Sequence, residues 1–236
     1  MNPFNDPIYG ELPDPPVDPR TVILCTPSHD RRCDTATINS CLNVLPHLAR
    51  NPYYMIGMSD ICLARNLMMH KVIEHSPYEW IVWVDSDIIF SVQDWMYLWD
   101  GDEELVTCPY AKKVLGLPAT KYGLGFTRVH RSVFNKIKNL NDRDGAPVAG
   151  EFFMFGEMIT SYHPSGIAEG ARYHGEDRGF FLLASLANVS HRLENRTRLK
   201  HVGPFEFGYP DQIADAGKMI TEEAAFKSET DDDGAN

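Results

Sequence analysis

Two aspartates one residue apart, Asp85 and Asp87, stand directly after the apolar run at residues 80–84. A continuous apolar run of this length is typical of a central parallel strand covered on both faces. Carboxylates at the end of such a strand can converge on one cation, and hard oxygen ligands suit Mg²⁺ or Mn²⁺. The pair therefore predicts a metal site that holds a diphosphate across the strand ends. The competing interpretation is a pair of solvated turn aspartates.

The elements around this pair alternate between strand and helix. Apolar runs predict strands at 21–25 (ended by Pro27), 53–56, 80–84 and 104–110, and later at 124–129. Helical spacing and capping residues predict helices at 34–46, at 60–75 and from Ser91, and later at 132–139 and 176–188. Residues 141–150 form a turn-rich loop. This order predicts an α/β fold with a mostly parallel sheet, in which the ligand lies beyond the carboxyl ends of the strands.

Composition narrows the class of protein. The chain has 236 residues and a net charge of −11. An acidic chain is a poor generic binder of nucleic acid, because backbone phosphates require Lys and Arg. No apolar run approaches the length of a membrane span, and the Pro-rich start does not read as a secretory signal. Five cysteines without metal-type spacing indicate thiols in a reducing compartment, so we expect a cytoplasmic protein.

Several motifs occur in the order found in one enzyme family. The sequence resembles the GT-A glycosyltransferases, particularly their small bacterial and phage-type members and the fungal mannan mannosyltransferases. The shared motifs, over roughly residues 21–203, are A-R-N at 64–66, D-S-D at 85–87, Y-A-K-K at 110–113 (Ala111 replacing the usual Pro), G-F-T-R-V-H-R-S-V-F at 125–134, G-E-D at 175–177 and H-V-G at 201–203. The resemblance implies a GT-A domain over residues 21–215, after an extended Pro-rich arm (1–20) and before a C-terminal segment with an acidic tail (216–236).

The resemblance also implies roles at the metal site. Asp87 would bind the metal directly, Asp85 would bind the metal or the donor ribose, and His201 would be the third protein ligand. Imidazole beside carboxylates is compatible with Mn²⁺. The metal would act as a Lewis acid toward the departing nucleoside diphosphate. Asp177 would be the base that takes the acceptor's proton, with Glu176 beside it as a second candidate or as a helix cap.

Other residues are candidates for donor binding. Similarity suggests that Arg65 and Asn66 contact the donor nucleotide, although a structural salt bridge is an alternative for Arg65. Lys112 and Lys113 can supply charge to the diphosphate. Pro27 and Ser28 follow the first strand and can line the base pocket through backbone groups. We list these residues as the expected cofactor-binding set: Arg65, Asn66, Pro27, Ser28, Asp85, Lys112 and Lys113.

The expected activity is transfer of a sugar from a nucleoside-diphosphate sugar, with a UDP-sugar or GDP-sugar favoured. The acceptor stays open among a glycan, a protein side chain, a lipid-linked sugar and a hydroxymethylated DNA base. Two other functions stay open as well. A nucleotidyltransferase on a similar sheet would normally carry a Gly-rich basic loop where this chain has residues 26–30. A catalytically silent nucleotide-sugar-binding module would not need the acidic residues together with His201.

Overall fold

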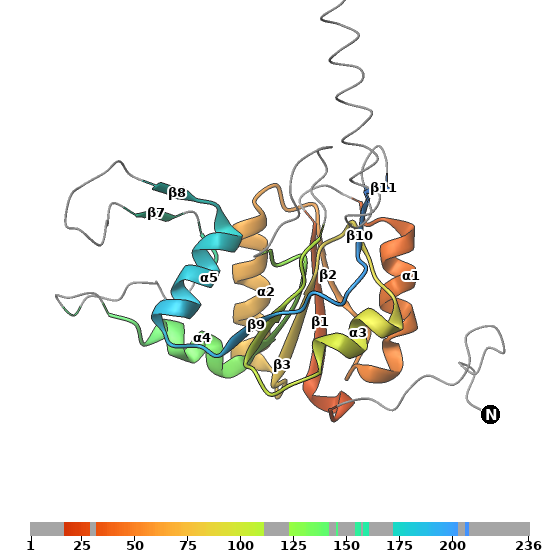
Figure 1. Ribbon diagram of the computed structural model, residues 1–236, viewed down its shortest axis with the longest axis horizontal. Coiled ribbons are helices and arrows are strands. Elements are labelled where there is room, and N and C mark those ends of the chain that lie inside the picture. Colours follow the sequence, from red (N-terminus) through yellow and green to blue (C-terminus); the bar gives the residue numbers. More distant parts are fainter. Residues whose placement is uncertain are drawn as a thin grey trace, which may run out of the picture.

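The apolar run at residues 80–84 forms the strand β3 (Trp80–Val84) inside a six-stranded sheet, as the sequence predicts (Figure 1). The computed structural model describes residues 17–28, 32–110, 123–141, 145, 154–156, 158–160, 172–202 and 206–207. The strand order is β2-β1-β3-β6-β5-β9. The other strands are β1 (Val22–Ser28), β2 (Tyr53–Ile56), β5 (Leu105–Thr107), β6 (Phe126–His130) and β9 (His191–Leu193).

Strand direction confirms a mostly parallel sheet. β1 pairs in parallel with both β2 and β3, and β9 pairs in parallel with β5. Only β6 is reversed, lying antiparallel between β3 and β5. The carboxyl ends of β1, β2 and β3 therefore meet at one edge, where the sequence predicts the ligand site.

One predicted boundary is wrong, because β1 does not end before Pro27 but runs through it to Ser28. The carbonyl of Ser28 accepts bonds from Gly57 and Met58 beyond the end of β2, so the nitrogen of Pro27, one residue earlier, faces the opposite side. On that side the pairing with β3 already ends at Cys25. Pro27 therefore costs the sheet no hydrogen bond, and the strand tolerates it.

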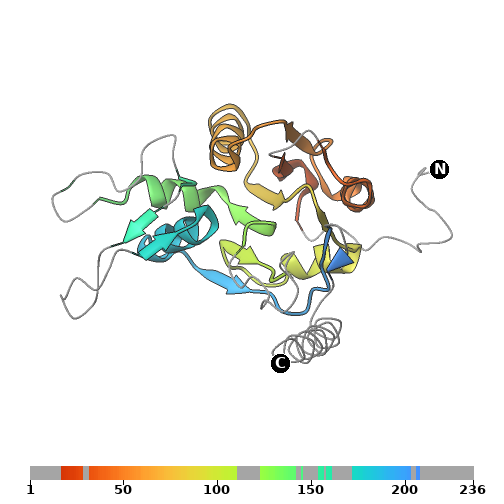
Figure 2. The ribbon, with the colours of Figure 1, turned by 90° about the horizontal axis from the view of Figure 1, so that it is seen from above.

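Alternating side chains divide the core into two layers. Ile23 and Trp83 belong to a cluster on the face covered by α2, α4 and α5, whereas Leu24 and Val84 belong to a cluster under α1 and α3. Figure 2 shows these helices on the two sides of the sheet. The helices among the described residues are α1 (Thr35–Asn43), α2 (Ile61–His75), α3 (Val92–Leu98), α4 (Arg131–Lys138) and α5 (Glu176–Leu186). This arrangement agrees with the GT-A-type α/β fold that the sequence predicts.

Smaller elements complete the described chain. Two 3₁₀ turns lie at Pro19–Thr21 and Leu45–His47. A hairpin pairs β7 (Met158–Thr160) with β8 (Arg172–His174). A three-stranded sheet joins β4 (Ile88–Ile89), β10 (Lys200–Val202) and β11 (Glu206–Phe207) in the order β11-β10-β4. No helix in the described ranges has both the length and the apolar character needed to cross a bilayer.

Candidate active site

The Asp85–Asp87 loop begins where β3 ends and is fixed by backbone hydrogen bonds. The N–H of Asp85 donates to the carbonyl of Gly125 at 2.9 Å, at the start of β6. The carbonyl of Ser86 accepts from the N–H of Asp34 at 2.8 Å, where α1 begins. The N–H of Ile88 returns to the carbonyl of Asp85 at 3.2 Å and closes a turn. Two neighbouring elements and the turn itself therefore fix the backbone that carries the two aspartates.

Asp87 lies beside His201, as the sequence predicts. β10 pairs antiparallel with β4, which places His201 opposite Ile88, and the N–H of Val202 donates to the carbonyl of Asp87 at 2.8 Å. This register brings Nε2 of His201 to 3.2 Å from Oδ1 of Asp87. Both side chains keep part of their surface in solvent, 13% for His201 and 25% for Asp87. A carboxylate oxygen and an imidazole nitrogen, both of which can ligate a metal, thus lie together just beyond the end of β3.

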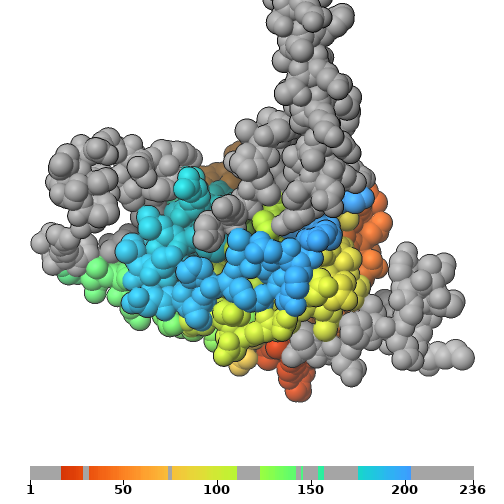
Figure 3. Space-filling view, in the orientation of Figure 1, coloured from red at the N-terminus to blue at the C-terminus, as the bar shows by residue number. Residues whose placement is uncertain are grey.

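Asp94 holds the segment that returns His201 to this place. Its Oδ2 accepts bonds from the N–H and the hydroxyl of Ser91, forming the capping box that opens α3. Its Oδ1 accepts from the N–H of Arg198 at 2.7 Å. Asp94 is buried, so both contacts are shielded from water. The space-filling view shows the returning segment, residues 191–202, lying on the surface beside α3 (Figure 3).

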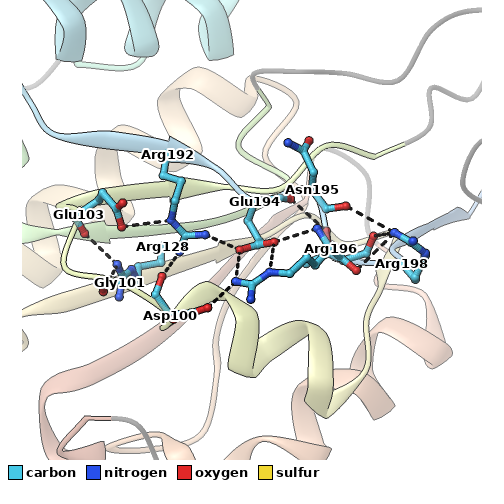
Figure 4. Close-up of polar contacts among 10 residues, drawn as sticks. Asp100, Gly101, Glu103, Arg128, Arg192, Glu194, Asn195, Arg196 and Arg198 are labelled. Atoms are coloured by element: carbon cyan, nitrogen blue, oxygen red, sulfur yellow. Dashed lines mark hydrogen bonds and ion pairs between the residues drawn. The ribbon is translucent and has the colours of Figure 1, made fainter.

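A second charged cluster anchors the same segment at the sheet edge (Figure 4). The buried carboxylate of Glu194 accepts 2.8 Å and 2.6 Å bonds from Nε and Nη2 of Arg196 and also pairs with Arg192. Arg196 reaches Asp100 at 2.6 Å, and Nε of Arg192 reaches Glu103 at 3.1 Å. Both arginines bind Glu194 of their own segment, and each binds one carboxylate from the loop between α3 and β5, Glu103 for Arg192 and Asp100 for Arg196. We assign the cluster to fold stability, since it places the start of β10.

Arg65 is the centre of the acidic part of the site. Its side chain, from the first turns of α2, is buried with 1% of its surface exposed. Nη2 donates to Oδ1 of Asp85 at 2.6 Å, and Nη1 lies 3.1 Å from Oδ1 of Asp177. Nη1 also forms an ion pair with Glu176, whose other oxygen accepts a bond from the Cys62 thiol at 3.1 Å. The salt-bridge alternative for Arg65 is therefore what the structure contains.

The electrostatics of this cluster favour a cation. Three carboxylates surround one guanidinium, so the group around Arg65 carries excess negative charge. Burial raises the pKa of the Asp85 carboxyl, Arg65 opposes this, and the carboxylates of Asp177 and Asp87 raise it further. Burial lowers the pKa of the Arg65 guanidinium, but Asp85 and Asp177 outweigh it and the net pKa is raised. A divalent cation near Asp87 would relieve the repulsion among the acids.

Tyr110 and Gly125 belong to the site, although the sequence only placed them within family motifs. The ring of Tyr110 packs edge-on to the ring of His201, with centroids 5.3 Å apart. Burial, with the charges of Asp85 and Asp177, raises the pKa of the Tyr110 hydroxyl well above its ordinary value. A Cβ atom at Gly125 would lie 2.8 Å from the Tyr110 ring and 2.9 Å from Oδ2 of Asp85. Only glycine lets these side chains approach so closely.

The amide of Asn66 is used within the protein. Nδ2 donates to the carbonyls of Cys62 and Phe155 at 2.8 and 2.7 Å, and Oδ1 accepts from the N–H groups of Met154 and Phe155 at 2.8 and 3.1 Å. These four bonds fill the capacity of one amide. Asn66 therefore fixes residues 154–155 against α2, and its amide has no group left for the donor contact that the sequence suggested.

The remaining predicted residues are placed less directly. Pro27 and Ser28 are buried at the carboxyl end of β1, where the Ser28 hydroxyl donates to the carbonyl of Arg32 at 2.7 Å. Its own carbonyl accepts from Gly57 and Met58, so this backbone group is already engaged. Lys112 and Lys113 lie outside the described residues.

The side chains near Asp87 determine whether this part of the site could bind a metal ion. Among the residues that the structure describes, no three or more His, Cys, Asp or Glu side chains gather closely enough to hold an ion by themselves. Asp87 and His201 are adjacent, but Oδ1 of Asp85 is turned to Arg65. Within the described part of the chain, two side chains are thus placed to act as ligands, which would suit a cation that takes its other ligands from phosphate and water.

Two solved structures can be compared with this chain, and each is similar to it at low sequence identity. No protein-family model and no curated protein matches the chain. The structure of A197 from STIV aligns with a TM-score of 0.48 and 14% identity over 77% of this chain and 85% of that one. The structure of a glycosyltransferase involved in glycosylation of the major capsid of PBCV-1 aligns with a TM-score of 0.31 and 17% identity, over 48% of this chain and 61% of that one. Because both TM-scores are below 0.5, we base the function on the chemistry of the site.

Proposed function

We propose that this chain is a divalent-metal-dependent glycosyltransferase that moves a sugar from a nucleoside-diphosphate sugar to an acceptor hydroxyl. One observation carries the proposal. The loop after the central strand places Asp87 beside His201 on one side and Asp85 beside Arg65 and Asp177 on the other. The side chains that would hold a metal and a diphosphate, and the carboxylate that would act as the base, are thus close to one another.

On the donor side, Asp87 and His201 are the protein ligands for Mn²⁺ or Mg²⁺. A bound cation would supply Lewis-acid stabilisation to the departing diphosphate. The described residues supply these two ligands, so phosphate oxygens of the donor and water would be the other ligands, as is usual for Mg²⁺ with nucleotides. Asp85, whose Oδ1 is bound to Arg65, is better placed to accept a bond from the donor ribose. The resemblance favours a UDP-sugar or a GDP-sugar, with Lys112 and Lys113 as further contacts to the diphosphate.

On the acceptor side, Asp177 is the base. Its side chain is 26% exposed, so an acceptor hydroxyl can reach the carboxylate. In an inverting reaction a carboxylate oxygen of Asp177 takes the proton of the acceptor hydroxyl while the hydroxyl oxygen bonds to the anomeric carbon. The bond from that carbon to the phosphate oxygen breaks, and the nucleoside diphosphate leaves with the electron pair. Glu176 is 15% exposed and is held by Arg65 and Cys62, so it is the weaker candidate.

The acceptor class stays open within this proposal. A glycan, a protein side chain and a hydroxymethylated DNA base each present a suitable hydroxyl. The net charge of −11 weighs against DNA, because a polyanion is repelled by an acidic surface.

The test is a panel of UDP-sugars and GDP-sugars incubated with the protein and Mn²⁺. Release of nucleoside diphosphate, to water or to an added acceptor, is measured with and without EDTA. The proposal predicts release from at least one donor that stops when the metal is chelated. Release from none of them, by a protein whose melting temperature is also unchanged by every donor with Mn²⁺, would contradict it.

A further inference from the structure

Arg65 binds, through different nitrogen atoms, one carboxylate on the proposed donor side of the site and one on the proposed acceptor side. Nη2 holds Asp85, at the carboxyl end of β3, and Nη1 holds Asp177, in the first turn of α5. The guanidinium comes from a third element, α2. One planar group therefore spans the donor side and the acceptor side, and its fork geometry fixes the distance between the two carboxylates.

The burial of Arg65 makes this bridge rigid. Its side chain is 1% exposed, and its Nε has no hydrogen-bond partner among the described residues. The orientation of the guanidinium is therefore set by the carboxylates that Nη1 and Nη2 bind. The arginine is held from both sides, and neither aspartate can move without the other two groups adjusting.

Resting on the proposed function, we propose that Arg65 is a positioning residue that couples the acceptor base to the donor site. Nη1 of Arg65 holds Asp177 at the place where an acceptor hydroxyl must meet the anomeric carbon. Nη2 binds Asp85, so the position of Asp177 is fixed relative to the loop after β3. A guanidinium is itself a cation and does not ligate a metal, for which Asp87 and His201 are the proposed protein ligands. Donor binding and turnover should therefore respond differently to a change at Arg65.

Arg65→Lys is the first variant. Lysine keeps the positive charge but has a single nitrogen, which cannot reproduce the two-nitrogen fork. The lysine nitrogen can still pair with Asp85, so the Kd for the nucleoside diphosphate with Mn²⁺ should stay within about threefold of the wild-type value. Asp177 loses its partner, and kcat should fall roughly 100-fold, a typical effect of small misplacement. When Arg65→Lys is added to Asp177→Asn, kcat should fall by less than about threefold further. Each change alone already removes the interaction between Arg65 and the base, so the two effects should not multiply.

Arg128→Lys is the matched control. Arg128 is also buried in the domain, but it donates to the carbonyls of Gly101 and Glu103 and lies over the rings of Trp80 and Trp99. Its replacement should lower the melting temperature and leave kcat within about twofold of the wild-type value. If Arg65→Lys does not fold, the neutral variant Arg65→Gln carries the same prediction of lost turnover with retained donor binding.

Three results would overturn the inference. They are a kcat within threefold of wild type in the folded Arg65 variant, a parallel loss of donor binding and turnover, and costs that multiply in the double variant. In each case the wild-type enzyme still transfers sugar, so only the role of Arg65 fails. Absence of turnover in the wild-type protein with every donor would instead overturn the proposed function and this inference with it.

Discussion

At the scale of single residues, Glu176 and Asp177 differ although they are neighbours at the start of α5. The residue that caps this helix is Gly175, and it makes no side-chain bond to the first turn. Neither acid is therefore the N-cap, and both carboxylates turn to Arg65. Glu176 also binds the Cys62 thiol, which leaves Asp177 as the more accessible acid. The acceptor base that we propose is therefore the more exposed of the two carboxylates, Asp177.

Asp177→Asn tests that assignment. Asparagine has the size of aspartate but cannot accept the proton, so kcat should fall by roughly 10²–10⁴. The melting temperature and the donor Kd should remain near wild-type values, because Asp177 is not the N-cap of α5 and the proposed metal ligands are Asp87 and His201. The measurement is steady-state turnover beside calorimetric donor binding. Turnover within threefold of wild type would exclude Asp177 as the base, and product stereochemistry would then be expected to show retention.

At the scale of elements, the start of β6 determines how closely Tyr110 and Asp85 approach. Gly125→Ala would put a Cβ atom 2.8–2.9 Å from the Tyr110 ring and from Oδ2 of Asp85. Overpacking of this kind costs about 1–3 kcal/mol of stability. Moving Asp85 should also weaken metal-dependent nucleotide binding about tenfold.

Gly156→Ala is the control for this change. A Cβ atom there meets nothing within 4 Å, so both stability and binding should stay near wild type. Urea unfolding and titration calorimetry on the two variants provide the comparison. If the two alanine variants behave alike, the close approach at Gly125 is not a constraint on the site.

The charged cluster around Glu194 predicts that the stability of the fold depends on pH. Burial raises the pKa of Glu194, but hydrogen bonds from Arg196 and Arg192 outweigh it and lower the pKa from 4.5 to about 2. A carboxylate with a lowered folded-state pKa stabilises the fold above pH 4.5, and this contribution disappears as the pH falls toward 2. By linkage it amounts to about 3 kcal/mol at neutral pH.

Glu194→Gln should remove this dependence. Urea unfolding at several pH values should show a large difference in unfolding free energy between wild type and variant above pH 5. The difference should shrink as the pH falls toward 2. Parallel curves for the two proteins over this range would show that Glu194 does not contribute in the way its contacts indicate.

At the scale of the whole molecule, local patterns predicted the elements better than the contacts among them. The bounds of β3 and the N-cap Ser91 follow from an apolar run and short-range hydrogen bonds, and the structure confirms them. The continuation of β1 through Pro27 depends on where its neighbour β3 stops pairing, so the sequence could not show it.

The site depended on long-range contacts in the same way. The ion pairs of Arg65 require the start of α5 to lie against α2, and α5 is more than a hundred residues further along the chain. The edge strand β9 was not predicted, because its three residues carry no clear alternating pattern. The proximity of His201 to Asp87 was reached only through the family resemblance, and the register of β4 and β10 provides its physical cause.

The central claim is that Asp87 and His201 hold a cation that binds a nucleoside diphosphate. Titration calorimetry of UDP and GDP in Mn²⁺, repeated in EDTA, tests it most directly in the wild type, Asp87→Ala and Asp85→Ala. We predict that one of the two nucleotides binds the wild type, and only with Mn²⁺. Asp87→Ala should weaken this binding at least about 100-fold, which corresponds to about 2.7 kcal/mol of binding free energy. Asp85→Ala should weaken it less, because Oδ1 of Asp85 faces Arg65. Binding that is equally strong in EDTA and in Asp87→Ala, or no binding of either nucleotide to the wild type, would contradict the account.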